Sequence, residues 1–207
     1  MANRQSSGYG LKPVNVLGNT PATSGQSKYT IKRAHGTAIY NGEPVKGIVN
    51  NTPGTGGFVE GAAAGSTDLI VGVFNGCFYN AATTEKPTWS NYYPASTTPA
   101  NSENITAFVN DNPFQEYQIA TDSAISATAD NVQKTFLQVC DTTASGESTA
   151  GRSNTTLDLT NDLATSGKQW RILRSAEDPD NDDFNAAYAN VIVVANAKAN
   201  LFLASNK

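Results

Sequence analysis

The sequence predicts an all-β protein, a β-barrel or β-sandwich of about ten short strands with an extended N-terminal arm and at most one or two short helices. Short segments that alternate apolar and polar side chains are typical of strands with one buried face. Turn-forming stretches of Gly, Pro, Asn, Ser and Thr separate these segments. Charged residues make up only 15% of the 207 residues. The short polar residues that replace them compete for helix backbone hydrogen bonds and so disfavour helices.

The first 27 residues are predicted to form the extended arm. They are rich in Gly, Pro, Ser and Asn and show no helical period. Their apolar patch, made of Leu11, Val14, Val16 and Leu17, is typical of a segment that packs onto another surface. Two interpretations stay open: an arm that docks on a surface, and a solvated tail.

The charge of the chain is unevenly distributed. The first 42 residues contain no acid and five basic side chains, Arg4, Lys12, Lys28, Lys32 and Arg33, whereas the rest contains nine Lys and Arg and all eighteen Asp and Glu. Such asymmetry bears on partners and not on the fold. A basic arm ahead of an acidic body can dock on an acidic surface, another copy of the chain included. We therefore predict that these basic residues and the apolar patch form an interface.

Residues 28–196 are predicted to form the body and residues 197–207 a C-terminal tail. The strongest apolar segment, residues 69–79, is expected to be a long, buried, bent strand, because it is rich in β-branched and aromatic residues and is interrupted by glycines. A turn at Asn75 and Gly76 would instead divide it into a hairpin. Further strands are expected at residues 28–34, 37–40, 87–93, 104–109, 115–121, 134–140, 155–159, 169–175 and 190–196. Short helices fit only at residues 126–135 and 182–189, with Ser126 or Asp182 as the N-cap.

The sequence offers little catalytic chemistry. The one histidine, His35, lies between two expected strands and before a glycine, which favours a turn over a Ser-His-Asp or Cys-His site. No two His or Cys residues stand at zinc-ligand spacing. Cys77 and Cys140 lie at or near the ends of apolar runs and are expected to be buried thiols, with a disulfide as the alternative. We expect no enzyme and no cofactor, and glycoside hydrolysis by paired acids is the enzymatic alternative.

The densest polar cluster is the acidic segment EDPDNDD. Its carboxylates at Asp178, Asp180 and Asp182 match the first three ligand positions of a calcium loop. However, Asp183 stands where that loop needs glycine and Ala189 where it needs glutamate. Three interpretations follow: a solvated loop tip, a bound cation, and a tip that receives a basic arm from a neighbouring copy or partner.

Trp89, Tyr92 and Tyr93 stand close together in the segment PTWSNYYP. Such side chains can stack on sugars or anchor a protein interface, because they give a large contact area at a low entropy cost. In the alternative, alternate residues of one strand place Trp89 and Tyr93 in the core.

Two classes of partner are not expected. Nucleic acid is disfavoured because the body is acidic and five dispersed basic residues are few for binding phosphates. A membrane is disfavoured because no run approaches the ~20 apolar residues of a spanning helix. The N-terminus lacks the apolar core of a secretory signal, so we expect the chain to fold in the cytosol where it is made.

Residues 69–93, LIVGVFNGCFYNAATTEKPTWSNYY, resemble a stretch of small virion structural proteins of tailed phages, particularly marine phages that infect cyanobacteria and other bacterioplankton. The segments FVNDNPFQEYQIAT (108–121) and DNDDFNAAYANVIVVAN (180–196) are similar to elements of the same group. The resemblance implies a head-associated protein of the virion, a capsid decoration or cement protein made in the host cytoplasm. Its implied partners are the phage major capsid protein and other copies of itself, and it supplies no catalytic residues.

From this resemblance we expect a protein that binds the outer capsid lattice and stabilises the head by bridging capsid subunits. Its arm would reach a neighbour and add a strand to a sheet edge. Low charge, short polar side chains and a β architecture suit a protein of a multicopy shell. The alternative is a receptor-binding or glycan-binding virion module on the capsid exterior or tail, with Trp89, Tyr92 and Tyr93 stacking on sugars.

Overall fold

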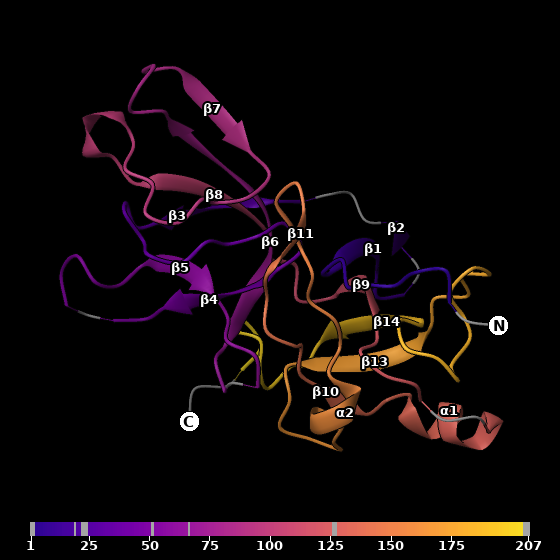
Figure 1. Ribbon diagram of the computed structural model, residues 1–207. Helices are drawn as coiled ribbons and strands as arrows, with labels where there is room; N and C mark the ends of the chain where they lie inside the picture. The colour runs from indigo at the N-terminus through magenta and orange to yellow at the C-terminus, as the bar shows by residue number, and fades with distance from the viewer. Residues whose placement is uncertain are drawn as a thin grey trace.

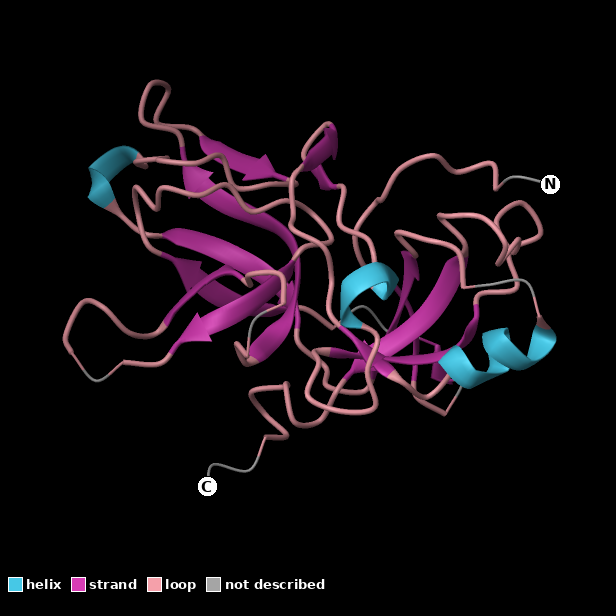
Figure 2. Cartoon of the chain, turned by 60° about the horizontal axis from the view of Figure 1, so that its bottom comes forward, coloured by secondary structure: helices cyan, strands magenta, loops and turns pink. Residues whose placement is uncertain are grey.

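The computed structural model describes residues 3–18, 20–21, 25–50, 52–65, 67–125 and 128–204. These residues form two six-stranded antiparallel sheets, a two-stranded hairpin and short helices (Figures 1 and 2). The elements in chain order are β1 (Lys12–Val16), β2 (Thr20–Pro21), β3 (Ser27–Ile31), β4 (Pro44–Ile48), β5 (Phe58–Gly61), β6 (Ile70–Asn80), β7 (Pro87–Ser90), η1 (Ala100–Ser102), β8 (Ile105–Asn110), β9 (Gln115–Ala120), α1 (Ala129–Thr135), β10 (Val139–Cys140), β11 (Glu147–Thr149), β12 (Arg152–Ser153), α2 (Leu159–Asp162), β13 (Trp170–Ser175) and β14 (Asn190–Ala195). The predicted all-β class is confirmed, and the described sheets are open and not closed into a barrel.

The two sheets form two lobes, and one strand of sheet B contributes side chains to both hydrophobic cores. Sheet A has the strand order β10-β13-β14-β9-β1-β2, and sheet B the order β3-β8-β6-β4-β5, with β7 also paired to β6. Figure 1 shows the sheets side by side, with the long strand β6 between them. Ile70 and Val73 of β6 pack in the core of sheet A, whereas Val71 and Phe74 pack in the core of sheet B. A single strand therefore joins the two hydrophobic cores.

The strand β6 is continuous, so the alternative of a hairpin at Asn75 and Gly76 is wrong. Instead, the register of β6 against β8 shifts between Phe74 and Gly76, which marks a β-bulge. Gly76 has a φ of +130°, and a Cβ atom there would lie 2.8 Å from the carbonyl oxygen of Ser90. Only glycine fits this position without a shift of the neighbouring chain. The bulge changes which residues of β6 face the core.

The N-terminal segment is part of the body. β1 pairs with β9 inside sheet A, and Leu11 lies in the core of that sheet with 2% of its surface exposed. The backbone N–H of Gly10 donates to the carbonyl oxygen of Thr155 at 3.1 Å. The interpretation of this segment as a solvated tail is therefore wrong for residues 3–18, which pack against their own chain. Burial of Leu11 and the ladder hydrogen bonds of β1 stabilise this segment on its own chain.

One of the two expected helices, at residues 126–135, is confirmed by α1, and the other is wrong. α1 begins at Ala129 with Thr128 as its N-cap, whose side chain accepts from the backbone N–H of Asn131. Ser126, the expected cap, lies outside the described residues. Residues 182–189 form turns and no helix, and the short helix α2 was not expected. Figure 2 shows α1 and α2 at the periphery of sheet A.

Two expected strands are also corrected, and Leu201 of the predicted tail contacts the body. The segments at 37–40 and 155–159 contribute only isolated bridges, at Ile39 and Leu157. The segment that begins the predicted tail crosses back to the body, where the N–H of Leu201 donates to the carbonyl oxygen of Ile70 at 2.9 Å. The Leu201 side chain packs against the core of sheet B. Ile39 and Leu157 are fully buried, so burial as well as the bridges holds the first two segments in place.

Candidate functional site

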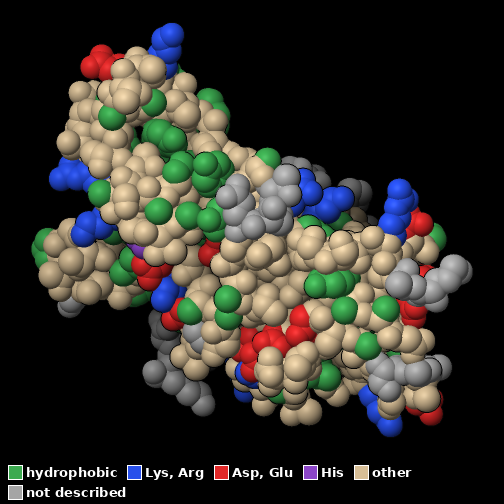
Figure 3. All heavy atoms as spheres, viewed as in Figure 1, with side chains coloured by type: hydrophobic (Ala, Val, Ile, Leu, Met, Phe, Trp, Pro, Cys, Tyr) green, Lys and Arg blue, Asp and Glu red, His purple; other side chains and the backbone are tan. Residues whose placement is uncertain are grey.

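Three aromatic side chains form a platform on the outer face of sheet B. This aromatic platform consists of Phe78 of β6, Trp89 of β7 and Phe108 of β8. Trp89 is 71% exposed, the centroids of its ring and the Phe78 ring are 4.8 Å apart, and its ring stacks on Phe108 at 5.1 Å with an interplanar angle of 21°. Figure 3 shows hydrophobic side chains gathered on this lobe, over β7 and β8. A large apolar ring is therefore held in place while it faces solvent.

The bulge of β6 explains how the platform forms. Without it, Phe74 and Phe78 would share one face of the strand, because side chains alternate with a period of two. With it, Phe74 is buried, and Phe78 pairs with Trp89 on the outer face. Gly76, which permits the bulge, stands opposite Phe108 in the register of β6 against β8.

The platform suits binding more than it suits chemistry. Exposed Trp and Phe side chains that are ordered before binding lose little conformational entropy when a partner covers them. Aromatic residues, Trp above all, dominate the binding energy of protein interfaces. Lys28 of β3 pairs with Phe108, so one of the predicted interface cations stands beside the rings. The arrangement is therefore typical of a contact surface for another molecule.

The three aromatic residues singled out in the sequence do not lie together on the surface. Trp89 is exposed, but Tyr93 is fully buried in the core of sheet B, and its hydroxyl donates to the carbonyl oxygen of His35 at 2.9 Å. Tyr92 is half-buried and stacks on Tyr40 at 6.1 Å. The expectation that Trp89 and Tyr93 share the core is thus wrong for Trp89. Phe78 and Phe108, which complete the platform, lie in expected strands, and the sequence does not mark them as a site.

The predicted interface of the N-terminal part is dispersed. Leu11 is buried, Val14 and Val16 are half-buried, Lys12 lines a cleft, and Leu17 is exposed. Lys32 and Arg33 lie in the exposed turn after β3, where the Arg33 side chain donates to the carbonyl oxygen of Ser102. His35 lies at the same turn, as its sequence context predicts: its N–H donates to the carbonyl oxygen of Lys32 at 3.1 Å. The basic residues therefore do not form one continuous surface.

The acidic segment receives the basic N-terminus of its own chain. Arg4 pairs with Asp180 at 3.2 Å, and the N–H of Arg4 donates to the carbonyl oxygen of Asp180 at 3.1 Å. Asn3 adds three hydrogen bonds: its amide nitrogen donates to the carbonyl oxygens of Asp183 and Ala187, and its side-chain oxygen accepts from the N–H of Asp183. The acidic segment therefore contacts a basic N-terminal residue, as one of the three interpretations predicts, but this residue belongs to the same chain and not to a neighbouring copy or partner.

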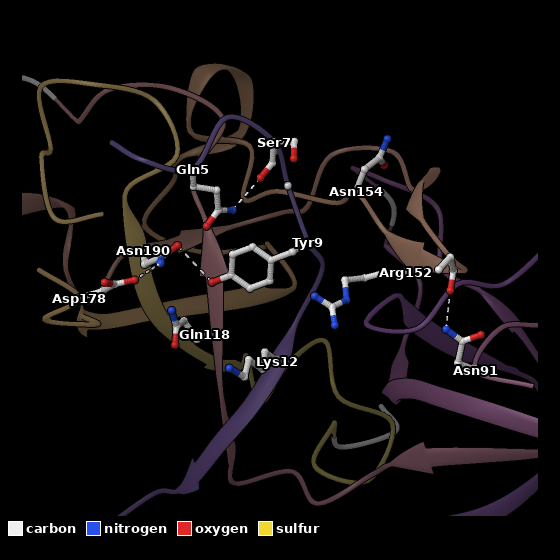
Figure 4. A pocket seen from close by; sticks show the side chains of 12 residues that line it. Gln5, Ser7, Tyr9, Lys12, Asn91, Gln118, Arg152, Asn154, Asp178 and Asn190 are labelled. Atoms are coloured by element: carbon white, nitrogen blue, oxygen red, sulfur yellow. Dashed lines mark hydrogen bonds between the residues drawn. The ribbon is translucent and has the colours of Figure 1, made fainter. Parts of the chain in front are cut away.

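A polar cleft opens where the N-terminal segment, sheet A and the β11–β12 hairpin meet. It has a volume of about 850 Å³ and is lined by Gln5, Ser7, Gly8, Tyr9, Lys12, Asn91, Gln118, Ala150, Arg152, Asn154, Asp178 and Asn190. Figure 4 shows the Tyr9 ring at its centre, with Asp178 and Asn190 on one side and the guanidinium of Arg152 extending toward it from the other.

Glycines on both sides of Tyr9 position its ring. A Cβ atom at Gly8 would lie 1.9 Å from the carbonyl oxygen of Asn154, and one at Gly10 would lie 2.8 Å from that of Gly42. Gly10 also has a φ of +78°, which favours glycine. The backbone can therefore lie flat against two neighbouring segments while Tyr9 lines the cleft.

A hydrogen-bonded chain fixes the polar wall of the cleft. The Tyr9 hydroxyl donates to the side-chain oxygen of Asn190 at 3.1 Å, and the amide nitrogen of Asn190 donates to Asp178 at 2.8 Å. Hydrogen bonds from Asn181 and Asn190, and the nearby charge of Lys12, lower the pKa of Asp178. Burial raises the pKa of Tyr9, which keeps its hydroxyl protonated as a donor. Of the residues that line the cleft, the sequence marks Lys12 as part of the predicted interface and Asp178 as part of the acidic segment, whereas Tyr9, between glycines in SGYG, is not marked as a site.

The two cysteines are free and buried, in separate cores, so the prediction of buried thiols is confirmed.

Among the described residues, no group of three or more His, Cys, Asp or Glu side chains could hold a metal ion. In the same part of the chain, no helix combines the length and apolarity that crossing a membrane requires.

Comparisons with known proteins give no relative for this chain. No protein-family model, no curated protein and no solved structure matches it.

Proposed function

We propose that this chain is a structural protein of a tailed-phage virion that decorates the outer capsid lattice and stabilises the head by bridging capsid subunits. The observation that supports it most is the aromatic platform of Phe78, Trp89 and Phe108. The resemblance of residues 69–93 to small virion structural proteins supports the same function, and all but one of the platform residues lie in that segment. The major capsid protein is the proposed partner of the platform.

The energetics favour a protein partner for this surface. Three apolar rings lie next to one another on one sheet face, and Trp is one of the residues enriched at interface hot spots. Truncation of such a residue costs about 2–4 kcal/mol of binding free energy, or about 30- to 1,000-fold in Kd. Repetition over a closed lattice would add avidity to each contact.

The first experiment asks where the chain is found. Mass spectrometry of purified particles of the phage that encodes it should detect the chain at a fixed, high copy number relative to the major capsid protein. Absence from the particles contradicts the proposal.

The second experiment tests the platform. The purified chain is mixed with empty capsids and sedimented, and Trp89→Ala is compared with Leu137→Ala, which removes an equally exposed apolar side chain far from the platform. Only Trp89→Ala should weaken co-sedimentation, by about 30-fold or more. Undiminished binding of Trp89→Ala means that the platform is not the contact. Loss of glycan-array binding in the same variant, without any binding to capsids, would support the receptor-binding alternative.

A further inference from the structure

The polar cleft has the composition of a site for a hydroxyl-rich ligand. Four of its side chains are amides that are not fully buried: Gln5, Asn91, Gln118 and Asn154. Each amide offers a donor and an acceptor, as a sugar hydroxyl does. The volume of about 850 Å³ falls within the ~300–1,000 Å³ of typical ligand sites.

The charges of the cleft narrow the class of ligand. Lys12 and Arg152 bring two positive charges and Asp178 one negative charge, so the site has a net charge of +1 and favours an anion. A bare phosphate or sulfate offers acceptors that suit Lys12 and Arg152, but Asp178 would repel it. A sugar with a carboxylate has both kinds of group: its hydroxyls can donate to Asp178, and its acid can accept from the cations.

The geometry is preorganised. Asn190 is 2% exposed, yet its side chain reaches the cleft, where it links Tyr9 to Asp178. Asn91 donates to the carbonyl oxygen of Ala150, which ties the hairpin to the lobe of sheet B. The backbone of Arg152 forms a bridge with Asn41, so the base of its side chain is held as well. Polar groups that are already fixed lose little entropy when a ligand binds.

We propose that this cleft binds an acidic saccharide, with its carboxylate at Arg152 and Lys12, its hydroxyls on Asp178 and the amides, and its apolar ring face against Tyr9. None of the residues that line the cleft belongs to the aromatic platform, so this proposal does not depend on capsid decoration. It adds a binding activity of the chain toward polysaccharides or glycans that contain uronic or sialic acids.

The test is a glycan array that carries uronate- and sialate-containing oligosaccharides beside their neutral counterparts, followed by calorimetric titration with the best binder. Wild-type protein should prefer the acidic members. Arg152→Gln should weaken their binding by about tenfold or more and abolish the preference. Arg33→Gln, which makes the same change of charge on the other lobe, should bind as wild type does. Trp89→Ala should also bind as wild type does.

Lys12→Gln provides a second variant, because Lys12 is exposed on β1 and its loss disturbs the fold least. This variant should bind acidic saccharides more weakly than wild type does and bind neutral ones equally well. Thermal unfolding of each variant verifies that it is folded. Absence of binding to every acidic saccharide overturns the proposal. Equal binding of acidic saccharides by wild type, Arg152→Gln and Lys12→Gln also overturns it. Loss of binding in Trp89→Ala alone overturns it as well, because that result would place the sugar on the platform.

Discussion

The buried carboxyl group of Glu43 predicts that the fold loses stability as the pH rises. Glu43 is 5% exposed and lies just before β4, where its Oε2 accepts from the N–H of Tyr40 at 2.9 Å. Gly61 makes room for it, because a Cβ there would lie 2.5 Å from Oε1. Burial raises the pKa of Glu43 from 4.5 to about 7. Ionisation is therefore harder in the folded than in the unfolded chain.

The sign and size of the effect follow from linkage. The stability is fully present below the unfolded pKa of 4.5 and is lost as the pH rises through the folded value of about 7. A shift of about 2.5 units corresponds to about 3 kcal/mol at pH 9, or about 6–12 °C in Tm for a chain of this size. Glu43→Gln keeps the shape of the side chain and removes the ionisation, so its stability should not show this loss.

Urea unfolding followed by tryptophan fluorescence at pH 5, 7 and 9 measures the difference between wild type and Glu43→Gln. That difference should move by about 2.5 kcal/mol in favour of the variant between pH 5 and pH 9, because a small part of the effect is already present at pH 5. Glu103→Gln, an exposed matched control, should follow wild type. A difference between wild type and Glu43→Gln that stays constant over this range would refute the reasoning.

Two further predictions concern the N-terminal segment and the contact surface. Leu11→Ala should lower the free energy of unfolding by about 2–5 kcal/mol, because it leaves a cavity in the core of sheet A, whereas Leu17→Ala, in the same segment but exposed, should stay within about 0.5 kcal/mol of wild type. Equal effects in urea unfolding would show that the segment is not part of the cooperative fold. Capsid binding through the aromatic platform should change by less than about threefold in Kd between ~50 and ~500 mM NaCl, because apolar contacts are little screened. A steep loss of co-sedimentation with salt would identify the basic residues as the main contact instead.

The all-β class could be predicted from sequence because five central strands have strong apolar patterns, and β6, β8, β9, β13 and β14 lie where expected. β1 could not, because its sequence KPVNV contains Pro and Asn and its partner β9 is about 100 residues away. Local composition predicts a loop there, and only the tertiary pairing makes it a strand.

The two candidate sites depended on information that periodicity lacks. A strict period of two places Phe78 on the same face as the buried Phe74, and one bulged residue reverses that assignment. The cleft brings together Lys12, Arg152 and Asp178 from three distant parts of the chain. No local motif marks such a set, since its members become neighbours only through the order of strands in sheet A and the position of the hairpin.

The separation of charge along the sequence has a different meaning once the fold is known. It predicted docking between molecules, but Arg4 contacts Asp180, and Lys12 lowers the pKa of Asp178, within the same chain. The Arg4 side chain is 82% exposed, so its ion pair contributes less than about 1 kcal/mol, and burial of Leu11 contributes more to holding the segment. The charges therefore favour the correct placement of the N-terminus on its own body. What the described surface offers a partner is the uncharged aromatic platform, together with a cleft whose cations and amides face solvent.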